Sequence, residues 1–215
     1  MELSDAVLAL PRWEARVRAG LASKRRDDFE LAAEAARAVG IDPWEAYYGR
    51  MERGAADAGE WFSLMRTEDP EQLARAIRLA EARIPLEKIA TGPAREMGWG
   101  KEFEAHDALD WVLQELHRLP GAGWPLIRAG VRSPTLRNRH MAIRALRAWD
   151  RDAWPDEARS LFTIALAEEP DDKVRESLRR LLAGEPDEDE DDDEGDDPVS
   201  GIGGDDPGDP EPWRG

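Results

Sequence analysis

The sequence contains no cysteine and only three histidines among its 215 residues. Without cysteine the chain cannot form disulfides, thiolate metal sites, haem–thiolate ligation or a thiol nucleophile. β-Branched residues are also scarce, since Val, Ile and Thr together number 19, against 32 Ala and 21 Leu. Because Ala and Leu favour helices and β-branched residues favour strands, this composition predicts an all-α protein.

Long apolar segments are missing as well. No stretch approaches the roughly 18 apolar residues of a membrane-spanning helix. The amino-terminal segment MELSDAVLAL has neither the basic start nor the long apolar run of a secretory signal. We therefore expect a cytoplasmic protein without a membrane partner.

The negative charge is concentrated at the carboxyl end. Residues 185–215 hold 15 of the 47 acidic residues and one of the 30 basic residues, a net charge of −14. Residues 1–184 hold the other 29 basic and 32 acidic residues, a net charge of −3. A segment so charged and so poor in apolar residues cannot offset the entropy cost of ordering. We predict a helical domain over 1–184 and a disordered acidic tail over 185–215, which either recruits a basic partner, mimics nucleic acid, shields a basic surface, or only increases solubility.

Proline and glycine mark the expected helix ends. An N-cap side chain precedes a proline at Asp42-Pro43, Asp69-Pro70 and Ser133-Pro134. Gly40, Gly130 and Gly184 lie where helices would end. We predict helices over 4–19 (interrupted near Pro11), 26–39, 43–54, 59–66, 70–84, 85–91, 102–119, 124–131, 134–149, 155–168 and 171–183.

The last third of the domain contains a weak internal repeat. Pro134 and Pro170 lie 36 residues apart, and each is followed by an apolar–Arg pair, Leu136-Arg137 and Val174-Arg175, and then by apolar residues at helical spacing. This pattern resembles the second helix of a HEAT repeat. We therefore predict a right-handed stack of antiparallel helix pairs, a HEAT-like α-α superhelix.

Arg139 lies on the apolar side of one predicted helix. With a helix beginning at Pro134, Arg139 has Ile143 at i+4 on the same side. An unpaired buried guanidinium is costly, so it needs a carboxylate or carbonyl partner. Either Arg139 lines a groove and grips an anionic ligand, or it pairs with a carboxylate of a neighbouring helix, as buried charges usually do. Arg137 and His140, from the same segment, are further candidate binding residues.

His106, Asp110 and His117 lie along the border of the apolar side of the predicted helix 102–119. Such residues could bind a divalent metal or form an acid–base pair. Their spacing allows only His106 and Asp110 to share one ion, and the HExxH pattern is absent. We expect a hydrogen-bonded histidine at the edge of the core and no metal, and keep His106 and Asp110 as candidate binding residues.

Eight tryptophans in residues 1–184 form another unusual feature. They could stack on bases or hold an apolar ligand, or they could pack between helices. Packing is favoured because several of them lie at helix ends. Trp99 and Trp124 are kept as candidate binding residues.

A resemblance to a known family rests mainly on the run Ser133-Pro134-Thr135-Leu136-Arg137-Asn138-Arg139. Together with 89–93, 119–123 and Trp149, it makes residues 60–183 similar to a group of bacterial HEAT-like helical proteins. Some of these carry the label limonene hydroxylase. The resemblance implies a helical-repeat fold, and the label implies a monooxygenase or an alcohol dehydrogenase. Both reactions need a haem, flavin, nicotinamide or iron centre, for which the sequence has no motif.

These observations favour a cytoplasmic interaction or scaffold protein whose helical array binds a peptide or protein partner. An oxidoreductase, as the label implies, is the alternative. A HEAT-like nucleic-acid-binding protein is the second alternative, and the net charge of the chain weakens it. We expect no cofactor, no metal and no catalytic residue.

Overall fold

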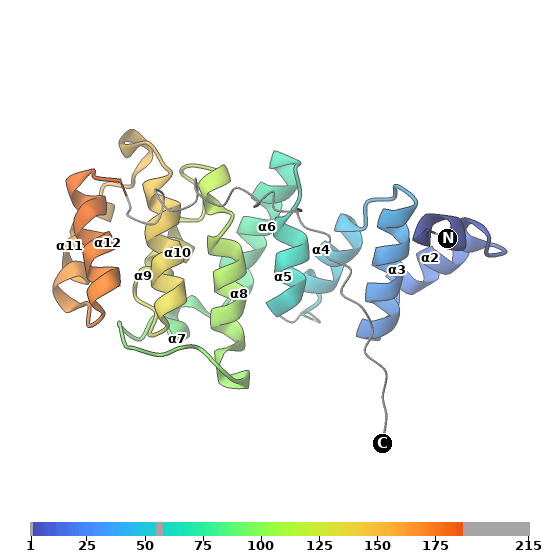
Figure 1. Cartoon of the computed structure of the whole chain (residues 1–215), viewed down its shortest axis with the longest axis horizontal. Coiled ribbons are helices and arrows are strands. Elements are labelled where there is room, and N and C mark those ends of the chain that lie inside the picture. The colour runs from blue at the N-terminus through green and yellow to red at the C-terminus, as the bar shows by residue number, and fades with distance from the viewer. Residues whose placement is uncertain (1, 55–57, 187–215) are drawn as a thin grey trace, which may run out of the picture. The chain divides into compact units, whose positions relative to one another are not determined.

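A computed structural model describes residues 2–54 and 58–186, so the predicted disordered tail lies outside the described residues from position 187 onward. Within this described part the chain is all-α, as predicted, and its only β-type pairing is an isolated bridge between Glu96 and Thr135. The elements are α1 (Leu3–Leu8), α2 (Trp13–Leu21), α3 (Arg26–Ala38), α4 (Trp44–Glu52), α5 (Ala58–Met65), α6 (Pro70–Arg83), α7 (Leu86–Ile89), α8 (Glu104–Leu113), α9 (Trp124–Val131), α10 (Leu136–Arg147), α11 (Ala158–Glu168) and α12 (Asp172–Ala183), with short 3₁₀ turns η1 (Lys101–Phe103), η2 (Leu116–Arg118) and η3 (Arg151–Ala153) (Figure 1).

Most predicted helices are present with ends close to those expected. The capping signals explain several of them: the Asp69 carboxylate accepts a hydrogen bond of 2.8 Å from the Glu71 amide, and Asp171 accepts one of 3.0 Å from Lys173. Gly184 ends α12 in the left-handed conformation, at a φ of 81°. There it donates its amide hydrogen to the Arg180 carbonyl, at 2.9 Å.

Two local predictions were wrong. The predicted helix 102–119 ends at Leu113, and a separate 3₁₀ turn follows. Ser133 is not the N-cap of α10, because that helix begins two residues after Pro134, and the Ser133 hydroxyl accepts from the Thr135 amide instead. α9 ends at Val131 as predicted, and Gly130 is its next-to-last residue. An added Cβ there would lie 2.8 Å from a Leu113 methyl carbon, so Gly130 permits close helix packing.

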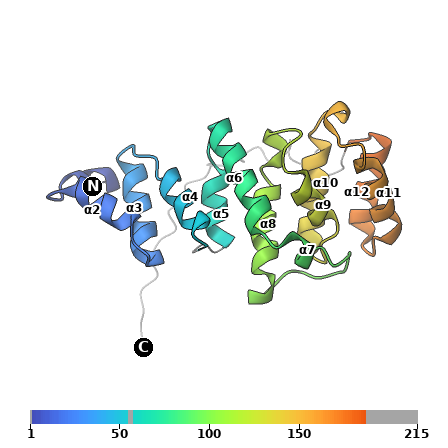
Figure 2. The same cartoon turned by 180° about the vertical axis from the view of Figure 1, so that it is seen from behind.

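Helices that follow one another in the chain pack as pairs: α2 with α3, α4 with α5, α9 with α10, and α11 with α12. The helices α5, α8, α10 and α12 also contact one another in that order (Figures 1 and 2). On the other side, α9 contacts both α6 and α11. Ala, Leu and Ile side chains from α3 to α12 fill the space between these helices in one continuous core.

Tryptophans connect helices through their indole N–H groups as well as their rings. Trp44 donates a hydrogen bond of 2.9 Å to the Leu64 carbonyl, which links α4 to the end of α5. Trp149 donates one of 3.0 Å to the Leu116 carbonyl, which links the end of α10 to η2. Both indoles are buried, so each bond satisfies a polar group that would otherwise be costly.

A buried ion pair joins the earlier helices. Arg50 on α4 and Glu60 on α5 are 4% and 1% exposed, with 3.0 Å between Arg50 Nη2 and Glu60 Oε1. Arg50 also donates to the Ser23 carbonyl at 2.9 Å and lies 4.4 Å from the centre of the Phe29 ring. One guanidinium therefore fastens α4 to α5, to α3 and to the turn before α3.

No helix between residues 2 and 54 or between 58 and 186 combines the length and the apolar character that crossing a membrane requires.

Candidate functional site

A buried polar cluster lies where α8 meets α10. His106 from α8 places its Nδ1 atom 3.0 Å from the Ser133 hydroxyl oxygen, just before α10. That oxygen is also 3.0 Å from the Thr135 hydroxyl oxygen and 3.3 Å from the Asn138 amide nitrogen. Burial lowers the pKa of His106, so the neutral imidazole is favoured.

Asp110, one helical turn after His106, forms a second contact between α8 and α10. Its Oδ2 atom lies 2.8 Å from Arg137 Nε and accepts a hydrogen bond of 2.8 Å from the Gln114 side chain. Asp110 is 3% exposed, while the Arg137 side chain is 58% exposed. The Asp110 Oδ1 atom is buried without a hydrogen-bond partner. Burial raises the pKa of Asp110 to about 6, although Arg137 and Gln114 oppose that rise.

The chemistry open to this cluster is limited by its burial. A serine 3.0 Å from a histidine is the arrangement of an activated nucleophile. However, Ser133 has no exposed surface and its hydroxyl already contacts Thr135 and Asn138. Among the described residues, no group of three or more His, Cys, Asp or Glu side chains is placed to hold a metal ion. The cluster therefore orients α8 and α10, and its only exposed member is Arg137.

Arg139 does not line a groove. Its side chain is fully buried and pairs with Glu169, with 2.8 Å both from Nε to Oε2 and from Nη2 to Oε1. Its Nη1 atom donates to the Ser133 and Pro134 carbonyls, each at 2.9 Å. The structural interpretation, pairing with a carboxylate beside another helix, is the one that the geometry supports.

The other candidates are dispersed. His140 is half-buried on α10. The pKa of Asp171 is lowered mainly by hydrogen bonds from the Val174 and Lys173 amides, and less by the charges of Arg95 and His140. Trp124 donates its indole N–H to Glu157 on the exposed surface. Trp99 is 79% exposed in the segment before α8, and His117 hydrogen-bonds to the Gln114 carbonyl, away from His106. Of the candidates, the structure brings together only His106, Asp110 and Arg137.

A line of rings and guanidinium groups extends from this cluster along the surface. Arg137 lies 5.4 Å from the centre of the Trp111 ring on α8, and that ring meets Phe62 on α5 edge-on at 4.8 Å. Arg66, which follows α5, lies 5.0 Å from the centre of the Phe62 ring. Phe62 is 38% exposed and both arginines are exposed. We call these four residues, Arg66, Phe62, Trp111 and Arg137, the arginine–aromatic line.

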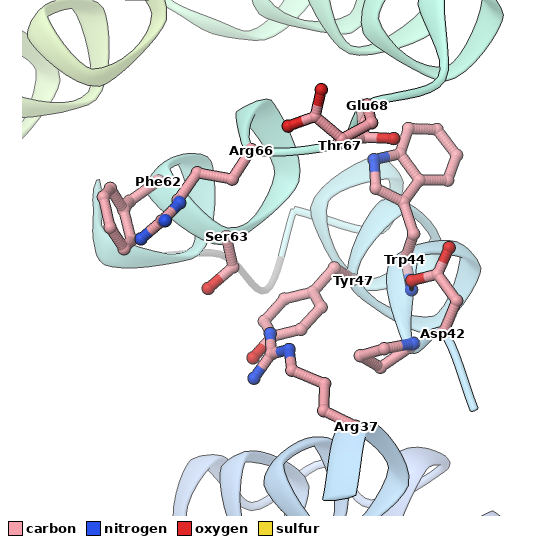
Figure 3. Close-up of a pocket in the computed structure, with 10 residues that line it drawn as sticks. Arg37, Asp42, Trp44, Tyr47, Phe62, Ser63, Arg66, Thr67 and Glu68 are labelled. Atoms are coloured by element: carbon pink, nitrogen blue, oxygen red, sulfur yellow. Dashed lines mark hydrogen bonds between the residues drawn. The ribbon is translucent and has the colours of Figure 1, made fainter. Parts of the chain in front are cut away.

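A pocket of about 560 Å³ adjoins this line, between α3, α4 and α5. Figure 3 shows Arg37 reaching from α3 toward Tyr47, with Ser63 and Arg66 along the same side of the pocket. Asp42 and Trp44 lie on the other side of Tyr47, with Glu68 toward the top of the view.

The floor of this pocket is held by Tyr47, whose hydroxyl lies 2.7 Å from a Glu30 oxygen. Burial is the main reason for the raised pKa of Tyr47, followed by its hydrogen bond to Glu30, so the hydroxyl stays a neutral donor. Sequence patterns did not indicate this pocket or the line beside it, because both depend on contacts between separate helices. The one signal in the sequence was the adjacent pair Trp61-Phe62. Adjacent side chains point to different sides of a helix, so the face that buries Trp61 leaves the Phe62 ring at the surface.

Comparison with known protein families, curated proteins and solved structures finds no match to this chain.

Proposed function

We propose that this chain is a non-catalytic interaction protein whose helix pairs form a HEAT-like superhelix and bind a peptide or protein partner. The repeat in the last two pairs supports the architecture. α10 and α12 have the same length and are offset by 36 residues. Arg139 and Arg175, equivalent under that offset, donate to the carbonyls of Ser133 and Glu169, each six residues earlier, at 2.9 and 2.7 Å.

The arginine–aromatic line is the observation that carries the binding function. It crosses α5, α8 and α10, which contact one another in order, and it keeps part of its apolar surface in solvent. Aromatic and arginine side chains are the residues that most often dominate the energy of protein interfaces. The line ends at the ion pair of Arg137 with the buried Asp110, which holds the exposed guanidinium in position.

The test compares partner capture by the full chain and two variants. Phe62→Ser removes the centre of the line, and Ile164→Ser removes an equally apolar side chain, 56% exposed on α11, as the matched control. We expect Phe62→Ser to lower the affinity of the captured partner at least tenfold, since central aromatic residues typically contribute about 2 kcal/mol or more. The control should bind normally. Equal binding by both variants would refute the proposed site.

The competing nucleic-acid function is tested with the same proteins. A chain of net charge −17 repels a phosphate backbone, whereas a peptide needs only a local match of charge. The test is a mobility shift of duplex or single-stranded DNA at low salt. If the unmodified chain shifts the DNA and Phe62→Ser abolishes the shift, the partner of this surface is nucleic acid and not a protein.

A further inference from the structure

The pocket between α3, α4 and α5 contains two guanidinium groups that contact aromatic rings. Arg37 lies 5.3 Å from the centre of the Tyr47 ring and Arg66 lies 5.0 Å from that of Phe62. Within residues 2–54 and 58–186, neither arginine forms an ion pair with a carboxylate, and the contact described for each is with an aromatic ring. Two unpaired cations over aromatic rings on one side of a pocket are suited to an incoming anion.

Hydroxyl groups complete this side of the pocket. Ser63 lies between Arg37 and Arg66 in Figure 3, and the side chains of Ser63 and Arg37 both lower the pKa of Tyr47, against the larger effect of burial. Tyr47 is fixed by burial and by Glu30, so it positions the neighbouring donors without competing for a ligand. A carboxylate placed here would find charged and neutral donors converging on it.

Acidic groups line other parts of the pocket. Asp42, across Tyr47, uses one oxygen to accept the Trp44 amide hydrogen at 2.9 Å, and Glu68, 98% exposed at the rim, has one oxygen 3.8 Å from Arg118 Nη2. These carboxylates disfavour a polyanion, because its second and third charges would face them. They favour a ligand whose anionic group has a cationic group as neighbour.

We infer that this pocket binds a peptide segment in which an acidic side chain is placed near a basic one, the acid on Arg37, Ser63 and Arg66 and the base toward Asp42 and Glu68. The volume of about 560 Å³ is within the range of pockets that enclose a short peptide segment or a small ligand. This inference rests on the proposed function and names the chemistry of its partner. The neighbouring Phe62 joins the pocket to the arginine–aromatic line, so a longer peptide can occupy both.

The test titrates the full chain, labelled with ¹⁵N, with the peptide acetyl-Ala-Glu-Ala-Lys-amide and follows the Trp44 indole and Ser63 amide signals. We expect saturable shifts with a dissociation constant in the millimolar range, roughly what two charge-assisted contacts support. Arg37→Gln and Arg66→Gln should each weaken binding about tenfold. Arg159→Gln, the same change at an exposed arginine of α11, is the matched control and should bind as the unmodified chain does.

Two further peptides and one nucleic acid complete the design. Replacing the glutamate of the peptide with glutamine should abolish the shifts, and replacing its lysine with glutamine should weaken them. The inference is overturned if no shift appears at 10 mM peptide or if either pocket variant binds like the control. It is also overturned if an oligothymidylate displaces the peptide and binds with the higher affinity of the two. Because Phe62 is unchanged here, partner capture that depends on Phe62 would leave the proposed function standing even if this pocket failed.

Discussion

At the scale of single residues, Arg139 is a charged side chain with no exposed surface, held in the core by an ion pair. It joins α10 to Glu169, which itself accepts the amide hydrogen of Asp171 at 3.0 Å, the N-cap of α12. A buried pair of this kind is a weak source of stability, because desolvation of both ions opposes their attraction. Removing only one partner is nevertheless costly, since the other remains buried as an unpaired charge.

We therefore predict that Arg139→Met lowers the free energy of unfolding by about 3–5 kcal/mol. The double change with Glu169→Leu should be less destabilised than Arg139→Met alone, because the orphaned carboxylate is also removed. Urea unfolding of the single and double variants measures the coupling directly. Arg144→Met, at an exposed position of the same helix, is the control and should change stability by less than about 0.5 kcal/mol. An Arg139→Met protein as stable as this control would contradict the prediction.

Asp110 gives the protein a stability that depends on pH. Its pKa is about 6 in the folded protein and ordinarily 3.8, so the folded state holds the proton more tightly than the unfolded state. Its contribution is therefore fully present below pH 4 and is lost as the pH rises toward 6. The lowered pKa of His106 acts in the opposite direction, since the unfolded chain takes up that proton more readily and stability rises with pH below about 6.5.

Asp110→Asn should remove the loss of stability between pH 4 and 6, a term of about 1–3 kcal/mol, and leave the rise that His106 causes. The measurement is the free energy of unfolding in urea at several pH values and constant salt. Glu104→Gln, at an exposed position of α8, removes one carboxylate charge without the burial and should keep the original profile. If Asp110→Asn and Glu104→Gln gave the same profile, Asp110 would not be the group responsible.

At the scale of helices, close approach is made possible by one glycine in α9. A Cβ at Gly130 would lie 2.8 Å from Leu113 Cδ1 and 2.9 Å from Ala142 Cβ, so α8, α9 and α10 meet at this point. The contact with α10 continues to the carbonyl of Asn138, 3.3 Å from the same position. Gly130 therefore sets the distance between three helices that carry or support the polar cluster.

Gly130→Ala should lower the melting temperature, because overpacking costs about 1–3 kcal/mol and exceeds the gain of up to about 1 kcal/mol from helix propensity. Gly49→Ala in α4 is the control, since its Cβ would meet only the flexible end of Arg53, at 3.2 Å. That variant should be as stable as the unmodified protein or slightly more so. Differential scanning calorimetry of both variants tests this, and a stabilised Gly130→Ala protein would disprove the packing argument.

At the scale of the whole molecule, the sequence predicted the helices better than the surfaces they form. N-cap aspartates, C-terminal glycines and the abundance of Ala and Leu are local signals, and they placed most helix ends correctly. The end of α8 was missed because neither proline nor glycine follows Leu113. The helical period also placed His106 and Asp110 on one edge correctly, and it marked Arg139 as a charge that needs a buried partner.

What could not be predicted depends on pairing between distant segments. Ser133 and Asn138 reach His106 only because α10 packs on α8, and Phe62 meets Trp111 only because α5 does so too. The pocket is formed by the ends of three helices, so no single periodic segment contains its pattern. Long-range packing of this kind is not encoded in any one stretch of residues.

The pair of Arg139 and Glu169 also limits how this fold can vary in size. Repeat proteins are often modular, so that a unit can be deleted or duplicated and the remainder still folds. Here the guanidinium of α10 has its counter-ion after α11, 30 residues later, and Arg147 and Arg151 donate to carbonyls of Ser177 and Leu181 at the same separation. Loss of the last two helices would leave a cation in the core with no neutralising charge. The helices before α11 and α12 therefore depend on this pair, which cannot be removed without redesigning the interface it leaves behind.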